Sequence, residues 1–266
     1  MSGVSISVIV TGACGKVGRH IVHGIAGEAD LRLVAAVDRK RVGQDIGTIA
    51  GGSPLGVAVV EDLAAAIGSA KPQVLVDFTT PDAVKDNVRT ALKKRVACVV
   101  GTTGLTPGDL AEVAALCREY STPALVAPNF AIGAVLLMEF AAQAAKYFSA
   151  AEIIELHHDQ KLDAPSGTAL KTAEMMRHAD GGLLGDEPAK PEDRPPRGLA
   201  AGKIRIHSVR LPGLVAHQEV IFGGLGQTLT LRHDSISRDS FLPGVLLAIR
   251  KVLSLEGLTY GLEEIL

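Results

Sequence analysis

Two adjacent histidines and a lysine precede a predicted helix start in the stretch ELHHDQKLDAPSGTAL, which runs from Glu155 to Leu170. A histidine exchanges protons near neutral pH, and a lysine adds a fixed positive charge. Ser166 is a preferred helix N-cap, and the backbone N–H groups of a first helical turn bind anions. These residues together predict a site for a small anionic substrate that must be both oriented and protonated.

The same stretch could also be a polar turn between two elements, because an isolated pair of histidines at a strand end is more often solvated than catalytic. No metal site is indicated, since no third ligand is arranged around His157 and His158. His207, His217 and His233 fall on or after strand-like runs, and we expect them to be structural or interface residues.

A second candidate site is VIVTGACGKVGRHIV, in which Gly12, Gly15 and Gly18 follow a predicted strand and open a predicted helix. In a dinucleotide-binding turn, the first glycine permits the tight turn, the second admits the pyrophosphate and the third allows close helix–strand packing. The pattern GxxGxxG is a weak variant of that fingerprint, and it also fits an ordinary glycine-rich turn.

The end of the second predicted strand separates these two interpretations. The fingerprint expects an acid about 20 residues on, which accepts hydrogen bonds from the adenosine ribose. Asp38 lies 26 residues beyond Gly12. Arg39 beside it would attract the 2′-phosphate of NADPH, which Asp38 would repel. We therefore predict a dinucleotide site that accepts NADH, NADPH or both.

Other small and polar residues follow predicted strands in DFTTPDA, VVGTTGL and APNFAIG. Ligands of open α/β sheets bind outside the carboxyl ends of the strands. Gly101, Thr102 and Thr103 would therefore lie near the nicotinamide ring, and Asn129 offers a partner for its carboxamide.

The elements that position these residues change type along the chain. Helical segments alternate with short β-branched runs at residues 5–10, 33–37, 74–78, 97–100 and 124–127. This alternation predicts a Rossmann-like, doubly wound parallel sheet. Pro81 and Pro107 stand where helix starts tolerate proline.

After Asn129 the pattern predicts a second, α+β domain. A helix at about 131–148 leads to the strand AEIIELHH and to the helix at PSGTAL. Three strand-like runs, KIRIHSVRL, VAHQEVIFG and QTLTLRHD, are closely spaced and predict a mainly antiparallel sheet. The stretch 181–202 is rich in proline and charge and is a candidate mobile loop.

The fold class is therefore α/β with two domains. We expect residues 1–129 with 239–266 to bind the dinucleotide, and residues 130–238 to bind substrate and carry subunit contacts.

Composition excludes several classes of function. The chain has 266 residues, of which 47% are hydrophobic, and its net charge of -2 provides no basic surface for nucleic acid. Cys14, Cys98 and Cys117 are widely spaced and contain no CxxC, so we expect neither disulfides nor zinc, and a cytoplasmic setting. The most apolar stretch is interrupted by Glu139, which argues against a membrane span.

The motifs resemble those of one family. GACGKVGRHIV, DFTTPDAV, VVGTTGL, APNFAIGAVLL and ELHHDQKLDAPSGTAL are similar to the 4-hydroxy-tetrahydrodipicolinate reductases, also called dihydrodipicolinate reductases, of bacterial lysine and diaminopimelate biosynthesis. VRLPGLVAHQEVIFGGLGQTLTLRHDS resembles the second domain of the same family. The similarity extends over nearly the whole chain, and its most specific block is HHxxK followed by DAPSGTA.

The resemblance implies reduction of 4-hydroxy-tetrahydrodipicolinate, with loss of water, by NADH or NADPH in a homotetramer joined through the second domain. His157 would donate or accept the proton, and Lys161 would be the second acid. The residues that bind the cyclic imino dicarboxylate would be His158, Lys161, Ser166, Gly167 and Thr168. The residues that bind the cofactor would be Gly12, Ala13, Cys14, Gly15, Lys16, Val17, Asp38, Arg39, Phe78, Gly101, Thr102, Thr103, Ala127, Pro128, Asn129 and Phe130.

Two alternatives remain open at this point. A dehydrogenase of the aspartate-semialdehyde type would need a thiolate near the nicotinamide, and none of the three cysteines is well placed for that. A nucleotide-sensing regulator would need a DNA-binding element or a basic face, and the sequence contains neither.

Overall fold

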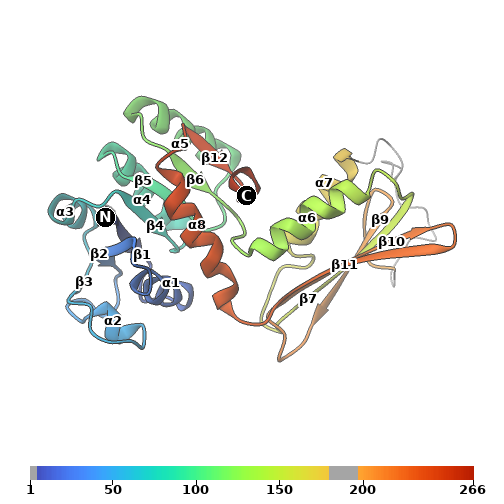
Figure 1. Cartoon of the computed structure of the whole chain (residues 1–266), viewed down its shortest axis with the longest axis horizontal. Coiled ribbons are helices and arrows are strands. Elements are labelled where there is room, and N and C mark those ends of the chain that lie inside the picture. Colours follow the sequence, from blue (N-terminus) through green and yellow to red (C-terminus); the bar gives the residue numbers. More distant parts are fainter. Residues whose placement is uncertain (1–4, 180–196) are drawn as a thin grey trace. The chain divides into compact units, whose positions relative to one another are not determined.

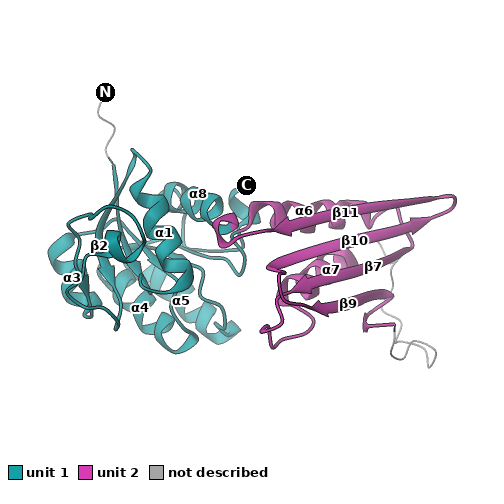
Figure 2. Cartoon of the chain, turned by 90° about the horizontal axis from the view of Figure 1, so that it is seen from below, with its two compact units in different colours: residues 1–130, 241–266 teal, residues 131–240 magenta. Residues whose placement is uncertain are grey.

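The computed structural model describes residues 5–179 and 197–266. The chain forms two compact units, which Figure 2 colours separately: unit 1 comprises residues 1–130 with 241–266, and unit 2 comprises residues 131–240. These limits lie within two residues of the domain limits expected from the sequence.

Unit 1 contains a seven-stranded parallel sheet with the strand order β12-β6-β5-β4-β1-β2-β3 (Figure 1). The predicted doubly wound sheet is therefore confirmed. The strands are β1 (Ile6–Thr11), β2 (Leu31–Val37), β3 (Val59–Val60), β4 (Val74–Asp77), β5 (Ala97–Val100), β6 (Ala124–Val126) and β12 (Leu258–Tyr260). The sequence did not predict β3 and β12, because runs of two and three residues carry no periodic signal.

The strand order reverses at β1. The chain runs from β1 outward to β2 and β3, and then returns to β4 on the other side of β1. The carboxyl ends of β1 and β4 therefore form the topological switch point, where ligands of such sheets bind. The glycine-rich turn follows β1, at this point.

Side chains cap some of the helices of unit 1, with Asp45, Asp62 and Thr106 as the caps. Pro81 and Pro107 occupy first-turn positions as predicted, and Thr106 forms a capping box with Asp109. The helices are α1 (Lys16–Ala26), α2 (Ile46–Ile49), α3 (Leu63–Ala70), α4 (Pro81–Lys93), α5 (Pro107–Tyr120) and α8 (Leu242–Val252), with a short 3-10 turn at η3 (Glu263–Ile265). A second 3-10 turn, η2 (Arg238–Phe241), leads from unit 2 into α8.

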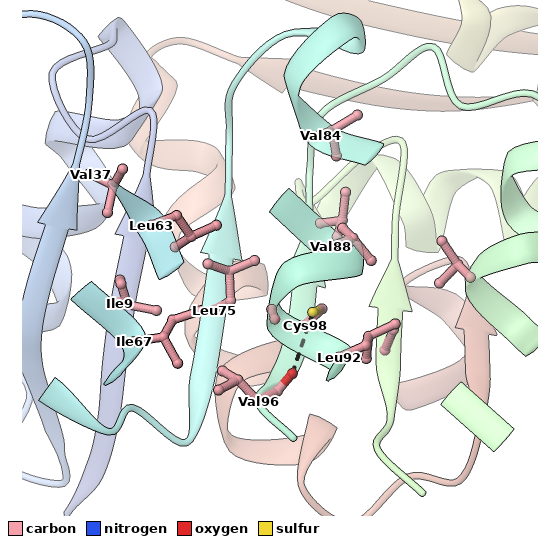
Figure 3. Close-up of a cluster of buried hydrophobic side chains, with 14 of the residues drawn as sticks. Ile9, Val37, Leu63, Ile67, Leu75, Val84, Val88, Leu92, Val96 and Cys98 are labelled. Atoms are coloured by element: carbon pink, nitrogen blue, oxygen red, sulfur yellow. Dashed lines mark hydrogen bonds between the residues drawn. The ribbon is translucent and has the colours of Figure 1, made fainter. Parts of the chain in front are cut away.

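A buried aliphatic cluster fixes the sheet of unit 1 against its helices. Figure 3 shows Ile9, Leu75 and Cys98, from three strands, in one cluster with Val88 and Leu92 of α4. All five side chains are at most 1% exposed. Because burying each aliphatic side chain contributes about 1.5–3 kcal/mol, the strand ends that carry the site residues stand on a rigid base.

Unit 2 contains a five-stranded sheet with the strand order β11-β10-β7-β9-β8. Its elements are α6 (Ile132–Ala144), β7 (Ala150–His157), α7 (Gly167–Ala179), β8 (Leu199–Ala201), β9 (Ile204–Arg210), β10 (Ala216–Gly224) and β11 (Gln227–Ser235). The mainly antiparallel character is confirmed, because only the β7–β9 pair among these strands is parallel.

The sequence did not predict the position of β7, which lies between β9 and β10 and is parallel to β9, since α7 carries the chain back across the sheet. Two details of the second-domain prediction were wrong. Helix α6 ends at Ala144, four residues before the expected end, and continues as a turn. Leu199–Ala201, expected to be loop, form β8, whereas residues 181–196 of the candidate mobile loop lie outside the described residues.

Candidate active site

The glycine-rich turn of unit 1 has the backbone geometry that the sequence predicts. Gly12 has φ +71°, and a Cβ there would lie 2.3 Å from the carbonyl oxygen of Phe78. A Cβ on Gly18 would lie 2.1 Å from the carbonyl oxygen of Gly12, so α1 packs directly on the turn. The predicted roles of Gly12 in the tight turn and of Gly18 in close packing are therefore confirmed. Gly15 is the N-cap of α1.

Asp38 holds this turn from the end of β2. Its carboxylate accepts one hydrogen bond from the backbone N–H of Cys14 and another from that of Lys40, both at 2.9 Å. Carboxylate oxygens have further lone pairs, so Asp38 can still accept from a ribose hydroxyl.

A cavity of about 390 Å³ adjoins the turn. The lining residues are Thr11, Gly12, Gly15, Val37, Asp38, Arg39, Lys40, Glu61, Leu63, Phe78, Thr79, Thr80, Ala83 and Asn87. The absence of side chains at Gly12 and Gly15 leaves the backbone open to a pyrophosphate, and Asp38 stands on the same cavity, so these residues fit a dinucleotide. The sequence prediction missed Glu61, since β3, which precedes it, is too short to recognise.

Asp77, whose carboxylate is buried, is a second residue near the site that the sequence prediction missed. It accepts hydrogen bonds from the hydroxyls of Thr11 (2.8 Å), Thr79 (2.8 Å) and Thr102 (2.6 Å), and from the amide of Asn87 (2.8 Å). Asp77 therefore ties together the ends of β1, β4 and β5. The Thr102 hydroxyl, expected near the nicotinamide, is engaged in this network.

An aromatic pair lies at the next strand ends. The rings of Phe78 and Phe130 are 5.6 Å apart between centroids, and a Cβ on Gly101 would lie 2.2 Å from the Phe78 ring. The structure thus brings together three of the residues expected to bind the cofactor. Four other residues of that set differ in burial: Ala127 is buried, Asn129 is half-buried, and Thr103 and Pro128 are exposed.

The cysteines lack the environment of a nucleophile. Burial raises the pKa of all three thiols. The pKa of Cys117 is raised to about 11, and that of Cys98 is raised far above the usual range. For Cys14, the negative charge of Asp38 raises the pKa further. A thiolate is the reactive form, so the aspartate-semialdehyde type of mechanism has no candidate residue among these thiols.

In unit 2, His157 lies at the end of β7 and contacts a buried carboxylate. Its Nδ1 is 2.5 Å from Oε2 of Glu155, which is fully buried two residues earlier on the same face of the strand. Arg210 on β9 donates to both oxygens of Glu155, at 2.9 and 2.8 Å. The backbone N–H of Ser166 also donates to Glu155, at 3.3 Å.

The loop after β7 holds the other predicted residues. The Nζ of Lys161 forms an ion pair with Asp163, at 2.7 and 2.8 Å from its two oxygens, and thereby lowers the pKa of Asp163. An anionic substrate would compete with Asp163 for Lys161. His158, which precedes them, accepts a hydrogen bond at its carbonyl from the Lys161 N–H (3.2 Å).

Ser166 is the N-cap of α7, as predicted, because its hydroxyl accepts from the N–H of Ala169 at 3.2 Å. Its backbone N–H donates to Glu155, whereas its hydroxyl, which accepts from Ala169, can still donate its own hydrogen to a substrate. Gly167, exposed, and Thr168, half-buried, are the first helical residues, at the positive end of the α7 dipole.

His207, His217 and His233 each contact other residues of unit 2, in keeping with the structural roles expected from the sequence. His207 contacts Glu152 at 2.8 Å and His217 contacts Asp234 at 2.6 Å. His233 lies against Gly133, where a Cβ would be 2.5 Å from its ring.

The ionisation of Glu155 predicts a pH dependence of stability. Burial opposes ionisation, but hydrogen bonds from His157, Arg210 and Ser208 lower the pKa of Glu155 to about 2, from 4.5. A carboxylate whose pKa is lower in the folded than in the unfolded protein stabilises the fold. This stabilisation is complete when the pH is above the pKa of the unfolded state, and it is lost as the pH falls towards the pKa of the folded state. We therefore expect the free energy of unfolding of Glu155→Gln to lie below that of the wild type near neutral pH.

The difference should shrink between about pH 4.5 and 2, because protonation removes the same charge from the wild type. Urea unfolding of both proteins across this range measures it. A difference that stays constant with pH would contradict the assigned pKa.

Comparisons with known proteins match both halves of the chain to one family. Residues 6–130 match the family model described as dihydrodipicolinate reductase, N-terminus, and residues 133–266 match dihydrodipicolinate reductase, C-terminus. The chain belongs to the dihydrodipicolinate reductase family. The resemblance seen in the sequence motifs is thereby confirmed, and the chain is an oxidoreductase that uses NADH or NADPH.

Individual family members are similar over nearly the full chain. The 4-hydroxy-tetrahydrodipicolinate reductase of Moorella thermoacetica is 53% identical over 98% of both chains, and that of Syntrophomonas wolfei is 51% identical over 97% of this chain and 98% of the other. A solved structure, dipicolinate-bound dihydrodipicolinate reductase from Paenisporosarcina sp. TG-14, is 45% identical, with a TM-score of 0.85 over 98% of this chain and 100% of that one.

Two negative findings apply to residues 5–179 and 197–266. No helix among them is both long and apolar enough to cross a membrane. No group of three or more His, Cys, Asp or Glu side chains among them is arranged to hold a metal ion.

Proposed function

We propose that this protein reduces 4-hydroxy-tetrahydrodipicolinate, with loss of water, to tetrahydrodipicolinate in lysine and diaminopimelate biosynthesis. The observation that carries the proposal is the placing of His157, Lys161 and the start of α7 around one strand end of unit 2. This set provides a proton-exchanging group, a cation and a helix N-terminus, which a cyclic imino dicarboxylate requires. The related Paenisporosarcina structure has dipicolinate bound, which supports a substrate of this class.

We assign the steps of the reaction to residues as follows. A dinucleotide held by the glycine-rich turn and Asp38 would supply the hydride that reduces the conjugated C=C–C=N system of the substrate after dehydration. Lys161 stabilises the charge that moves to the ring nitrogen, and His157 donates or accepts the proton. The N–H groups of Gly167 and Thr168, with the side chain of His158, hold the carboxylates. When substrate binds, the ammonium of Lys161 exchanges its ion pair with Asp163 for contact with the substrate, since Asp163 and the substrate are both anionic.

The cofactor side of the proposal rests on the cavity of unit 1. We assign the pyrophosphate to the turn from Gly12 to Val17 and the nicotinamide end to Phe78, Gly101 and Phe130. Asp38 and Glu61 line the ribose end of this cavity together with Arg39 and Lys40. Two acids favour the ribose hydroxyls of NADH and two bases favour the 2′-phosphate of NADPH, so we propose that both cofactors are used.

Replacing Arg39 by alanine tests this assignment. We expect KM for NADPH to rise about tenfold, the effect of losing about 1.4 kcal/mol of charge-assisted hydrogen bonding, while KM for NADH stays nearly unchanged. Steady-state kinetics with each cofactor measure both constants. An equal rise for NADH and NADPH would show that Arg39 does not contact the 2′-phosphate.

We further propose a homotetramer joined through unit 2 and a cytoplasmic location. The sheet of unit 2 supports the first, because the side chains of Ile154, Leu156 and Ile221 remain partly exposed on the face away from α6 and α7. The cytoplasmic location is supported by Cys14, Cys98 and Cys117, which form no disulfides, because cysteines in secreted proteins are more often paired in disulfides. Light scattering on the purified protein tests the oligomeric state.

A coupled assay tests the reaction itself. Substrate is generated in situ from pyruvate and aspartate semialdehyde by a synthase, and absorbance at the nicotinamide band is followed with NADH and NADPH in turn. We expect oxidation that depends on the synthase product and is lost in Lys161→Ala. Cofactor binding without oxidation would leave the fold assignment intact and overturn the substrate.

A further inference from the structure

Glu155 is an unusual residue for the middle of a packed strand. It is fully buried on the face of β7 that carries Ala151 and Ile153, next to the apolar core of unit 2. A buried carboxylate is costly unless donors surround it, and Glu155 has such donors: His157, both terminal nitrogens of Arg210 and the backbone N–H of Ser166. Glu155 therefore places a buried negative charge in direct contact with His157, the residue to which we assign proton transfer.

The ionised state of Glu155 determines which nitrogen of His157 carries a hydrogen. A carboxylate with a pKa of about 2 is ionised at neutral pH and is an acceptor only. The ring nitrogen that faces it, Nδ1, must then be a donor. Neutral His157 is thus held with Nδ1 protonated, and its Nε2 is left to exchange the proton with substrate.

Arg210 connects this pair to the loop that follows β7. Besides Glu155, its guanidinium donates to the carbonyl oxygens of Val209 (2.7 Å) and Asp163 (2.6 Å). Asp163 is also the partner of Lys161. Of the charged groups in this network, Glu155 contacts the His157 ring directly, Arg210 contacts Glu155, and Lys161 and Asp163 lie with the neighbouring His158 on the loop that Arg210 contacts.

We infer that Glu155, clamped by Arg210, is the positioning residue that fixes the ring orientation and tautomer of His157. The inference rests on the proposed role of His157 in proton transfer. When imidazolium His157 gives its Nε2 proton to the substrate, the ring becomes neutral and keeps the Nδ1 hydrogen on Glu155. In the reverse direction Glu155 stabilises the imidazolium that forms, without taking its proton.

The test compares Glu155→Gln with Glu152→Gln. Glu152 lies on the same strand and also pairs with a histidine, His207, and with Arg197, but is not part of the proposed site. We expect Glu155→Gln to lower kcat about 10–100-fold, the usual effect of removing a residue that orients an active ligand or base. KM for substrate and cofactor should change less than about threefold, and Glu152→Gln should retain wild-type kcat.

Ring-nitrogen NMR of histidine-labelled full-length protein reads the tautomer, with the His157 signals assigned from a His157→Gln sample. We expect Nδ1–H in the wild type and in Glu152→Gln, and a shift towards Nε2–H in Glu155→Gln. A fall in kcat with an unchanged tautomer would reduce Glu155 to a structural role and overturn the inference. If Glu155→Gln does not fold, the wild-type spectrum alone still tests the inference. Neutral wild-type His157 with its hydrogen on Nε2 would overturn it.

The outcomes separate this inference from the proposed function. If His157→Gln loses turnover while Glu155→Gln behaves like Glu152→Gln, the positioning role fails and the proposed function stands. If His157→Gln keeps wild-type turnover, the role of His157 in the proposed function fails, and the positioning role of Glu155 fails with it.

Discussion

Replacing His157 by glutamine should lower kcat by about 10²–10⁴-fold, the range that a positioned acid or base contributes. Glutamine occupies a similar volume but cannot carry the proton, so the loss reports chemistry rather than packing. The affinity for NADH should be unchanged, because His157 lies in unit 2 and the dinucleotide turn lies in unit 1. Turnover in the coupled assay and NADH titration by fluorescence measure the two quantities separately.

His207→Gln is the matched control for this prediction. His207 lies on β9 beside β7 and pairs with Glu152 at 2.8 Å, so it is a second histidine–glutamate pair of the same sheet. Its replacement should leave kcat within about twofold, since it touches none of the assigned site residues. A loss of NADH affinity in His157→Gln, with kcat preserved, would show that the proton role is assigned to the wrong residue.

Replacing Gly12 by alanine should damage both stability and cofactor binding. An alanine at φ +71° is strained, and its Cβ would lie 2.3 Å from the Phe78 carbonyl oxygen. We expect the free energy of unfolding to fall by about 1–3 kcal/mol from the backbone strain. NADH affinity should fall by about a hundredfold or more, because the turn must move where the pyrophosphate approaches the backbone.

Gly68→Ala is the control for this second prediction. Gly68 lies within α3, where a Cβ would meet nothing within 4 Å. Alanine there should stabilise the protein by about 0.5–1 kcal/mol and leave NADH affinity unchanged. Thermal unfolding and NADH titration of both variants test the pair. Equal NADH affinity in Gly12→Ala and the wild type would exclude the turn as the cofactor site.

The sequence predicts those parts of the molecule that depend on local chemistry. Gly12 and Gly18 have the roles that their spacing indicates, and Ser166 caps α7 as its type and position suggest. The parallel sheet was predictable because β-branched runs alternate with helical segments. These features depend only on residues close together in the chain, so they can be predicted from the sequence.

The sequence does not predict contacts between distant residues. In the sequence, Asp77 is an ordinary strand end, yet its carboxylate accepts hydrogen bonds from Thr11 and Thr102, which are 66 and 25 residues away. Glu155 looks like an outward-facing strand residue until Arg210, 55 residues later, is brought beside it. The position of β9 next to β7 was missed for the same reason, since strand pairing depends on the path of α7.

Transfer of deuterium from the cofactor tests the central claim most directly. NADH carrying deuterium at the transferable position of the nicotinamide is supplied with substrate generated in situ, and the product is analysed by mass spectrometry. We predict that the wild type forms tetrahydrodipicolinate carrying a single deuterium and that Lys161→Ala does not. Oxidation of the NADH with no deuterium in the product would contradict the account, because the hydride would then have gone elsewhere.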